Sequence, residues 1–182
     1  KQVNRVWEIA DQANIISTPA WSKNWVVVGN QAGVIKGYSA KTGKQKWQYV
    51  TEGPIYSSPA IQDDNVVFGS ADGGVYCLQL QTGQLRWKWQ ANAAVLGSPV
   101  LAGDTLYIGT SDHRIVALHV QSGKLIWQFE ESKKIIEDKT NTACIDFSFD
   151  RIVAINRDFL FYSISALKPA SSKLEQYGLS SS

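Results

Sequence analysis

The sequence predicts an all-β protein, a β-propeller of four-stranded antiparallel blades, with about four blades in this chain. Three observations lead to this prediction. Markers recur every forty residues, short runs of β-branched and aromatic residues lie between turn residues, and no stretch combines helical spacing with helix caps. One small twisted sheet has two apolar faces and cannot cover either alone, so blades stacked around an axis are expected.

The recurring markers are a proline, two glycines and a tryptophan, all in one register. They are Pro19, Pro59 and Pro99; Gly29, Gly69 and Gly109; Gly43, Gly83 and Gly123; Trp47, Trp87 and Trp127. One step back from Trp47 lies Trp7. One step forward the pattern fails, and it resumes after an insertion of six residues, where 151–164 matches 105–118.

The second unit shows the four strands expected in each blade. β-branched and aromatic residues fill 57–61, 65–70, 74–80 and 84–89. The turn sequences "QDD", "ADGG" and "QTG" separate these runs. The proline falls early in the first strand, where its missing N–H is tolerated.

These units give the expected organisation of the chain. A lone strand is expected at 3–10, complete blades at 15–49, 55–89 and 95–129, an incomplete blade at 143–164, and a Ser-rich tail at 165–182. The first segment is an outer strand without its blade. The fourth blade lacks its outer strand, and Lys173 stands in the position of the tryptophan.

The strand missing from the fourth blade is of the kind found at the N-terminus, and three ways of closing the propeller ring are compatible with this match. The N-terminal strand completes the fourth blade of its own chain, or it completes the fourth blade of a second copy in a homodimer, or the chain is part of a longer propeller. An uncovered end would expose an apolar sheet face and an unpaired strand edge.

The repeated tryptophans are expected to fill the gaps between neighbouring blades. A ring at a fixed place on each outer strand can pack against the next sheet. The turn glycine before each of these strands closes the hairpin. The residues expected in this structural role are Trp7, Trp47, Trp87, Trp127, Gly43, Gly83 and Gly123.

The segments "IKGYSAKTGKQKW", "VYCLQLQTGQLRW" and "IVALHVQSGKLIW" resemble the tryptophan-docking motif of the pyrroloquinoline-quinone-like (quinoprotein-type) propeller repeats, A-x-D-x-x-T-G-x-x-x-W. Here the Ala position holds Gly37, Cys77 and Ala117, and the Asp position holds Ser39, Gln79 and His119. The resemblance implies a propeller and a periplasmic or otherwise extracytoplasmic location. Its known members include quinoprotein dehydrogenases and outer-membrane assembly lipoproteins.

For the quinoprotein dehydrogenases of that family, the resemblance implies a vicinal disulfide, a calcium ion held by Glu and Asn, and a catalytic Asp. The two cysteines, Cys77 and Cys144, are not adjacent and form no metal motif. No catalytic residue, cofactor or metal site is therefore expected. A net charge of +2 gives no reason to expect nucleic acid as a partner, and no apolar run is long enough to span a membrane.

A protein partner is expected, and four residues are candidates for contacting it. Trp21 and Trp25 have no aromatic counterparts in the other units, so their roles are a partner contact, local cover of the first blade, or shelter under a further domain. Lys133 and Lys134 lie in a charged segment that interrupts the repeat. Four lysines of the first unit predict a basic, solvated surface: Lys36, Lys41, Lys44 and Lys46.

The sequence thus favours a non-catalytic propeller that mediates protein–protein interaction or assembly, a scaffold built of repeats. Two alternatives remain. One is an accessory propeller domain of a larger enzyme whose catalytic domain lies outside this chain. The other is a dimerising periplasmic or luminal sensor domain.

Overall fold

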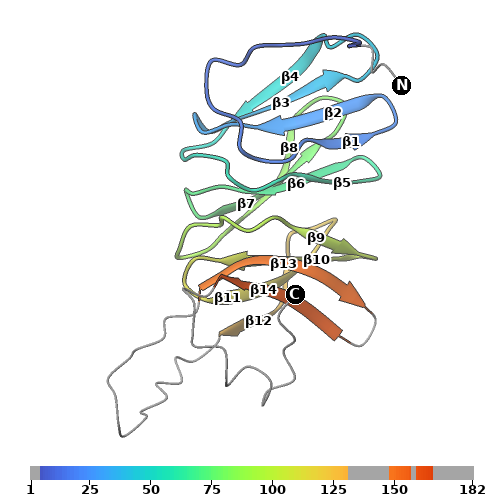
Figure 1. The fold of residues 1–182 in the computed structure, drawn as a ribbon. Coiled ribbons are helices and arrows are strands. Elements are labelled where there is room, and N and C mark those ends of the chain that lie inside the picture. Colours follow the sequence, from blue (N-terminus) through green and yellow to red (C-terminus); the bar gives the residue numbers. More distant parts are fainter. Residues whose placement is uncertain (1–4, 131–147, 157–158, 166–182) are drawn as a thin grey trace, which may run out of the picture.

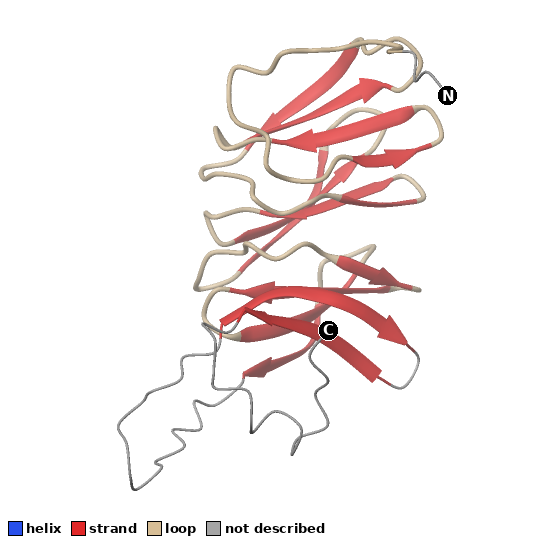
Figure 2. Ribbon diagram, viewed as in Figure 1, coloured by secondary structure: helices blue, strands red, loops and turns tan. Residues whose placement is uncertain are grey.

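In the computed structural model, residues 5–130, 148–156 and 159–165 are described, and every regular element within them is a β-strand. This confirms the all-β prediction (Figure 2). Three four-stranded antiparallel sheets follow one another along the chain, each with its strands in sequential order. A two-stranded sheet follows them.

The strands have the following bounds. The first sheet contains β1 (Ala20–Ser22), β2 (Trp25–Gly29), β3 (Val34–Ser39) and β4 (Gln45–Val50). The second contains β5 (Ala60–Gln62), β6 (Asn65–Gly69), β7 (Gly74–Gln79) and β8 (Leu85–Gln90). The third contains β9 (Val100–Ala102), β10 (Thr105–Thr110), β11 (Arg114–His119) and β12 (Leu125–Glu130), and the last pair is β13 (Ser148–Asn156) and β14 (Phe159–Ser165).

The sheets stack one behind the next as the blades of a partial propeller (Figure 1). The short strands β1, β5 and β9 lie next to one another along the stack. The last pair lies at the end of the stack opposite to the first sheet, with β13 against β9 and β10. The described chain is therefore an open stack with two ends.

The core lies between the blades. One cluster joins the first and second sheets and includes Val27, Ile35, Ile55, Val66, Phe68 and Leu78. Another joins the second and third sheets and includes Val67, Val75, Val95, Leu106, Ile108 and Val116. Every residue of β6 is buried, because the second sheet has a neighbour on each face. Burial on both faces explains why the apolar residues Val66, Val67 and Phe68 follow one another in that strand instead of alternating with polar ones.

Candidate functional site: the open end of the blade stack

An indole ring joins each blade to the next. Trp47 on β4 is buried, and its Nε1–H donates a hydrogen bond to the carbonyl oxygen of Leu80 in the second blade at 2.7 Å. Trp87 on β8 repeats the arrangement with the carbonyl oxygen of Val120 at 2.8 Å. Both indoles satisfy their single donor inside an apolar joint, which is what a buried tryptophan requires.

The turn glycine of the next blade forms the surface on which each indole lies. A Cβ atom placed on Gly83 would lie 2.7 Å from the Trp47 ring, and one placed on Gly123 would lie 2.5 Å from the Trp87 ring. These glycines also adopt φ values of +70° and +66°, which favour glycine. The docking position therefore consists of a glycine with a left-handed backbone and, three residues earlier, a backbone carbonyl oxygen that accepts the hydrogen bond from the indole.

The N-terminal segment docks on the first blade in the same way. Trp7 donates from Nε1 to the carbonyl oxygen of Ala40 at 2.8 Å, and its ring lies against Gly43. Among the described residues, however, 5–10 pair with no strand. This segment thus occupies the place of the outer strand of a blade that would precede the first.

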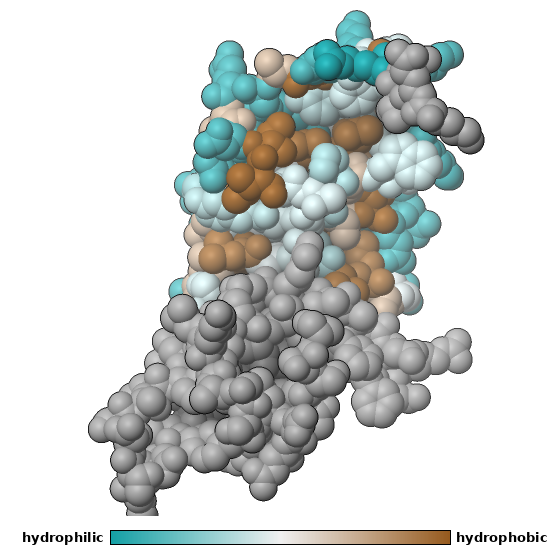
Figure 3. Space-filling model, viewed as in Figure 1, coloured by the Kyte–Doolittle hydropathy of each residue, from teal (hydrophilic) through white to brown (hydrophobic). Residues whose placement is uncertain are grey.

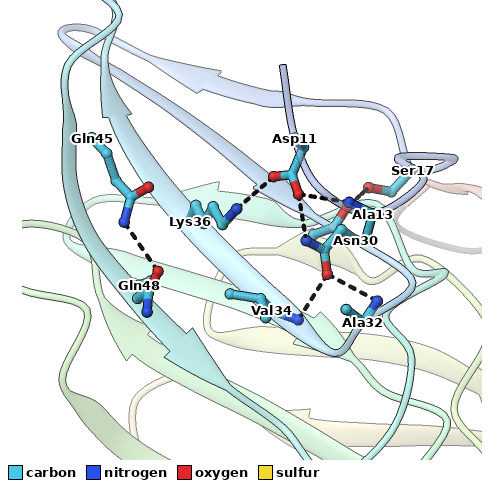
Figure 4. Close-up of polar contacts among 10 residues, drawn as sticks. Asp11, Ala13, Ser17, Asn30, Ala32, Val34, Lys36, Gln45 and Gln48 are labelled. Carbon is cyan, nitrogen blue, oxygen red and sulfur yellow. Dashed lines mark hydrogen bonds and ion pairs between the residues drawn. The ribbon is translucent and has the colours of Figure 1, made fainter. Parts of the chain in front are cut away.

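The segment continues into a polar network at the first blade (Figure 4). One carboxylate oxygen of Asp11 accepts hydrogen bonds from Asn30 Nδ2 at 3.0 Å and from the Ala13 N–H at 3.2 Å, and the other lies 2.7 Å from Lys36 Nζ. The Asn30 side-chain oxygen in turn accepts from two backbone N–H groups. Burial raises the pKa of Asp11, but the bonds from Lys36, Ala13 and Asn30 outweigh it and hold that pKa below its ordinary value.

Lys36 is therefore paired, in contrast to the solvated lysine that the sequence predicted. The equivalent positions of the next blades hold the buried residues Tyr76 and Val116. A lysine is tolerated at this place because the facing element is the N-terminal segment with Asp11. The sequence contained one sign of this pairing. Asp11 is an acidic residue at a position where the other units hold the uncharged Thr51 and Ala91.

The two non-repeating tryptophans have different surroundings. Trp21 on β1 is 71% exposed. Trp25 on β2 is half-buried, and its ring centroid lies 6.4 Å from that of Trp47. Trp25 therefore packs within the first blade, while Trp21 reaches solvent. Lys133 and Lys134 lie outside the described residues, and their expected partner contact stays a prediction.

Trp21 belongs to the face of the first sheet that is turned away from the second. In the second sheet its counterpart Ile61 packs against the cluster shared with the first sheet. The same side of the first sheet therefore faces out of the stack, and we call it the open end; by strand register it carries Trp21, Val26, Lys36 and Tyr38. Trp21 is the exposed residue of these four, because Val26 is half-buried, Tyr38 is buried and Lys36 is paired with Asp11. Figure 3 shows that apolar side chains also reach the surface in patches on the viewed side of the first two blades.

The outer strand of the third blade is also uncovered. Trp127 on β12 is 40% exposed, and Phe129 is 56% exposed, whereas the corresponding Trp47 and Trp87 are buried. β13 lies against β9 and β10, the inner half of this blade. Among the described residues, no docking turn covers the outer half as in the preceding blades. Trp127 packs on Tyr107 at a centroid distance of 5.8 Å.

Cys77 and His119 have different surroundings. Cys77 is buried between blades, and burial raises the pKa of its thiol to about 12, so it stays protonated. His119 lines a shallow depression with Lys124 at the outer rim. Within the described part of the chain, no three His, Cys, Asp or Glu residues are placed to hold a metal ion, and no helix is long and apolar enough to cross a membrane.

Residues 4–157 match the family model described as outer membrane protein assembly factor BamB. The chain belongs to this family of PQQ-like repeat proteins. BamB from Moraxella catarrhalis superposes with a TM-score of 0.71 and 18% identity over 87% of this chain, which spans 46% of that protein. The computationally designed Ika4 protein gives a TM-score of 0.74 with 18% identity, covering 90% of this chain and 94% of Ika4.

Enzymes share the fold too. The quinohemoprotein alcohol dehydrogenase ADHIIG from Pseudomonas putida gives a TM-score of 0.60 with 18% identity, over 68% of this chain and 21% of the enzyme. At such identities the likeness shows the β-propeller fold alone. No curated protein is a match for the sequence.

Proposed function

We propose that the chain is a non-catalytic β-propeller module that binds protein and acts in assembly, with the open end as its contact surface. The observation that carries this proposal is Trp21, a large aromatic side chain that is 71% exposed on a sheet face turned out of the stack. Membership of a family described as an outer membrane protein assembly factor supports an assembly role.

The chemistry of this face suits a protein partner. Burying one tryptophan removes on the order of 150–250 Å² from water, and tryptophan is enriched among the residues that dominate binding energies. The Asp11–Lys36 pair on the same side of the sheet is satisfied internally, so a partner can cover it without leaving a bare charge. An apolar anchor flanked by satisfied polar groups is typical of interface centres.

An accessory domain of a larger enzyme is the second candidate. The likeness to a quinohemoprotein alcohol dehydrogenase, of which the chain spans 21%, favours it. In that case too the open end would contact protein, namely the rest of the enzyme.

A photo-crosslinking amino acid in place of Trp21 tests the proposed surface. It should form covalent adducts with a protein, either another copy of this chain or a different protein. The same amino acid in place of the exposed Gln81, on the β7–β8 turn of the second blade, should not. Adducts at Gln81 and none at Trp21 would contradict the proposal.

The side chain itself is tested by Trp21→Ala. We expect the variant to keep the thermal unfolding temperature of its monomer and to weaken association by roughly tenfold or more, since truncating an anchor residue costs over about 1.4 kcal/mol. The matched variant Trp25→Ala should instead lower unfolding stability, because Trp25 packs on Trp47. Unchanged association of Trp21→Ala would rule out Trp21 as an anchor.

A further inference from the structure

Two elements of this structure are complementary: one is docked like an outer strand but has no strand partner among the described residues, and the other is a sheet whose edge could accept an outer strand. The segment 5–10 is docked through Trp7 as an outer strand would be, yet it pairs with no strand among the described residues. The pair β13–β14 forms a sheet of two strands, whereas the three preceding sheets have four. The edge of β14 is where the repeat would place an outer strand.

The sequence after β14 is unsuited to supply that strand in the repeat register. Each docking turn requires a glycine at φ between +66° and +70°. No glycine occurs in 159–177, and Pro169, whose ring locks φ near −65°, falls in this region. Lys173 stands in the position of the tryptophan. In the repeat register, the outer strand of this sheet would therefore come from another segment.

The N-terminal segment of the same chain lies too far away to fill the gap. It packs on the first sheet through Ala40 and Gly43, while β13 packs on β9 and β10 of the third. Figure 1 shows these elements at opposite ends of the stack. Stacked sheets lie about 10 Å apart, so the separation is on the order of 30–40 Å, and strand pairing requires about 4.8 Å.

We infer that the partner at the open end is a second copy of this chain: residues 5–10 of one copy pair with β14 of the other, and the exchange is reciprocal. This inference rests on the proposed function and names its partner. Addition of a strand to an exposed sheet edge is a common mode of recognition, and a reciprocal exchange gives a closed two-fold dimer. The fourth blade of each copy then stacks on the open end of the other and covers Trp21.

The repeat fixes the register of the exchanged strand. Trp47 lies opposite Gly37 and Trp87 lies opposite Cys77 in their blades. The same register places Trp7 opposite 162–163 of β14, and Glu8 opposite 161–162. Trp7 already has its docking position on the first blade, so the segment is preorganised to receive a strand partner.

The backbone of the exchanged strand is tested by Glu8→Pro, with Glu8→Ala as the matched control. Both variants lose the same exposed side chain, but only proline removes an N–H and restricts the strand. In sedimentation equilibrium the native chain should have twice its monomer mass of 20.1 kDa. Glu8→Ala should remain dimeric, and Glu8→Pro should dissociate at least tenfold more readily.

Disulfide trapping distinguishes exchange between chains from pairing within one chain. In a Cys144→Ser background, copies carrying Glu8→Cys are mixed with copies carrying Tyr162→Cys, or Phe161→Cys for the adjacent register. Cross-linked dimers of the two variants are expected. A chain that carries both cysteines and cross-links only within itself would overturn the inference.

The outcomes separate this inference from the proposed function. A native chain that stays monomeric at all concentrations, or a dimer indifferent to Glu8→Pro, overturns strand exchange. If the photo-crosslinker at Trp21 then captures a different protein, the proposed contact surface stands with another partner. If it captures no protein, both proposals fail.

Discussion

At the scale of single residues, the joints between blades depend on the turn glycines as much as on the indoles. The ring of Trp47 lies where a side chain at Gly83 would begin. The same glycine has a left-handed backbone, so its replacement carries two separate costs. Gly103 provides the comparison, because it has φ of +57° but nothing within 4 Å of a Cβ atom.

Gly83→Ala should therefore destabilise the fold more than Gly103→Ala does. We expect Gly103→Ala to cost about 1 kcal/mol for backbone strain. Gly83→Ala should cost roughly 3 kcal/mol, because the added methyl group also displaces the indole of Trp47. Urea unfolding measures both values. Equal losses would mean that the glycine contact contributes nothing to the joint.

The carboxylate of Asp11 should make stability depend on pH. Its pKa is lowered in the folded state, so its contribution is complete above the unfolded value of about 3.9 and is lost as pH falls through the folded pKa. At pH 7, Asp11→Asn should cost about 1–2 kcal/mol, as expected for a hydrogen-bonded charged group. Once the pH has fallen below the folded pKa of Asp11, the variant and the native chain should converge.

Denaturant unfolding across pH measures this difference. Glu8→Gln is the control, because the Arg5–Glu8 pair is exposed and such pairs contribute little. A deficit of Asp11→Asn that persists unchanged at low pH would show that the contribution does not come from the ionised carboxylate.

At the scale of elements, corresponding strands differ in what covers them. β8 and β12 occupy the same place in their blades, yet Trp87 is buried and Trp127 is 40% exposed. The difference arises because the docking turn beyond β8 belongs to a complete blade. A strand's sequence therefore sets its pairing, and its neighbour decides its burial.

Substitution of these two tryptophans should show the difference in energy. Trp87→Ala should cost roughly 3–5 kcal/mol, because it leaves a cavity in the joint and an unpaired carbonyl at Val120. Trp127→Ala should cost less, about 1 kcal/mol, since Trp127 is 40% exposed. Chemical denaturation of the two variants compares them directly, and a reversed order would contradict the assignment of the joints.

The sequence was sufficient to predict the propeller fold because each joint repeats. A contact that recurs every forty residues appears as a marker, and the indole–glycine contacts appear in this way. The Asp11–Lys36 pair could not be predicted from the repeat, because it occurs in one blade only. Spacing alone also did not separate Trp21 from Trp25, since their difference depends on which side of the sheet has a neighbour.

At the scale of the whole molecule, the stack has two unlike ends. In the part of the chain that the structure describes, one end presents a segment docked like an outer strand but without its blade, and the other presents a two-stranded sheet without an outer strand. Such ends can be satisfied by closure of the chain on itself, by a second copy, or by further blades of a longer propeller. The separation of the ends in this structure favours the second copy over closure of the chain on itself.

Dimerisation by strand exchange should link stability to protein concentration. Because association stabilises only the folded state, the unfolding temperature should rise as the chain concentration increases. Glu8→Pro should abolish this dependence, and Glu8→Ala should retain it. Differential scanning calorimetry over a hundredfold range of concentration tests the point. A concentration-independent transition in the native chain would contradict the linkage.

The uniform spacing between each indole and its acceptor, 33 residues in all three joints, makes the joints interchangeable. Any outer strand fits any turn, so a duplication of one forty-residue unit would enlarge the ring without requiring a single new contact. Loss of one unit would shorten it just as smoothly. In such a protein, ring size can change through recombination within a gene, while the tryptophan, glycine and carbonyl contact of each joint is kept.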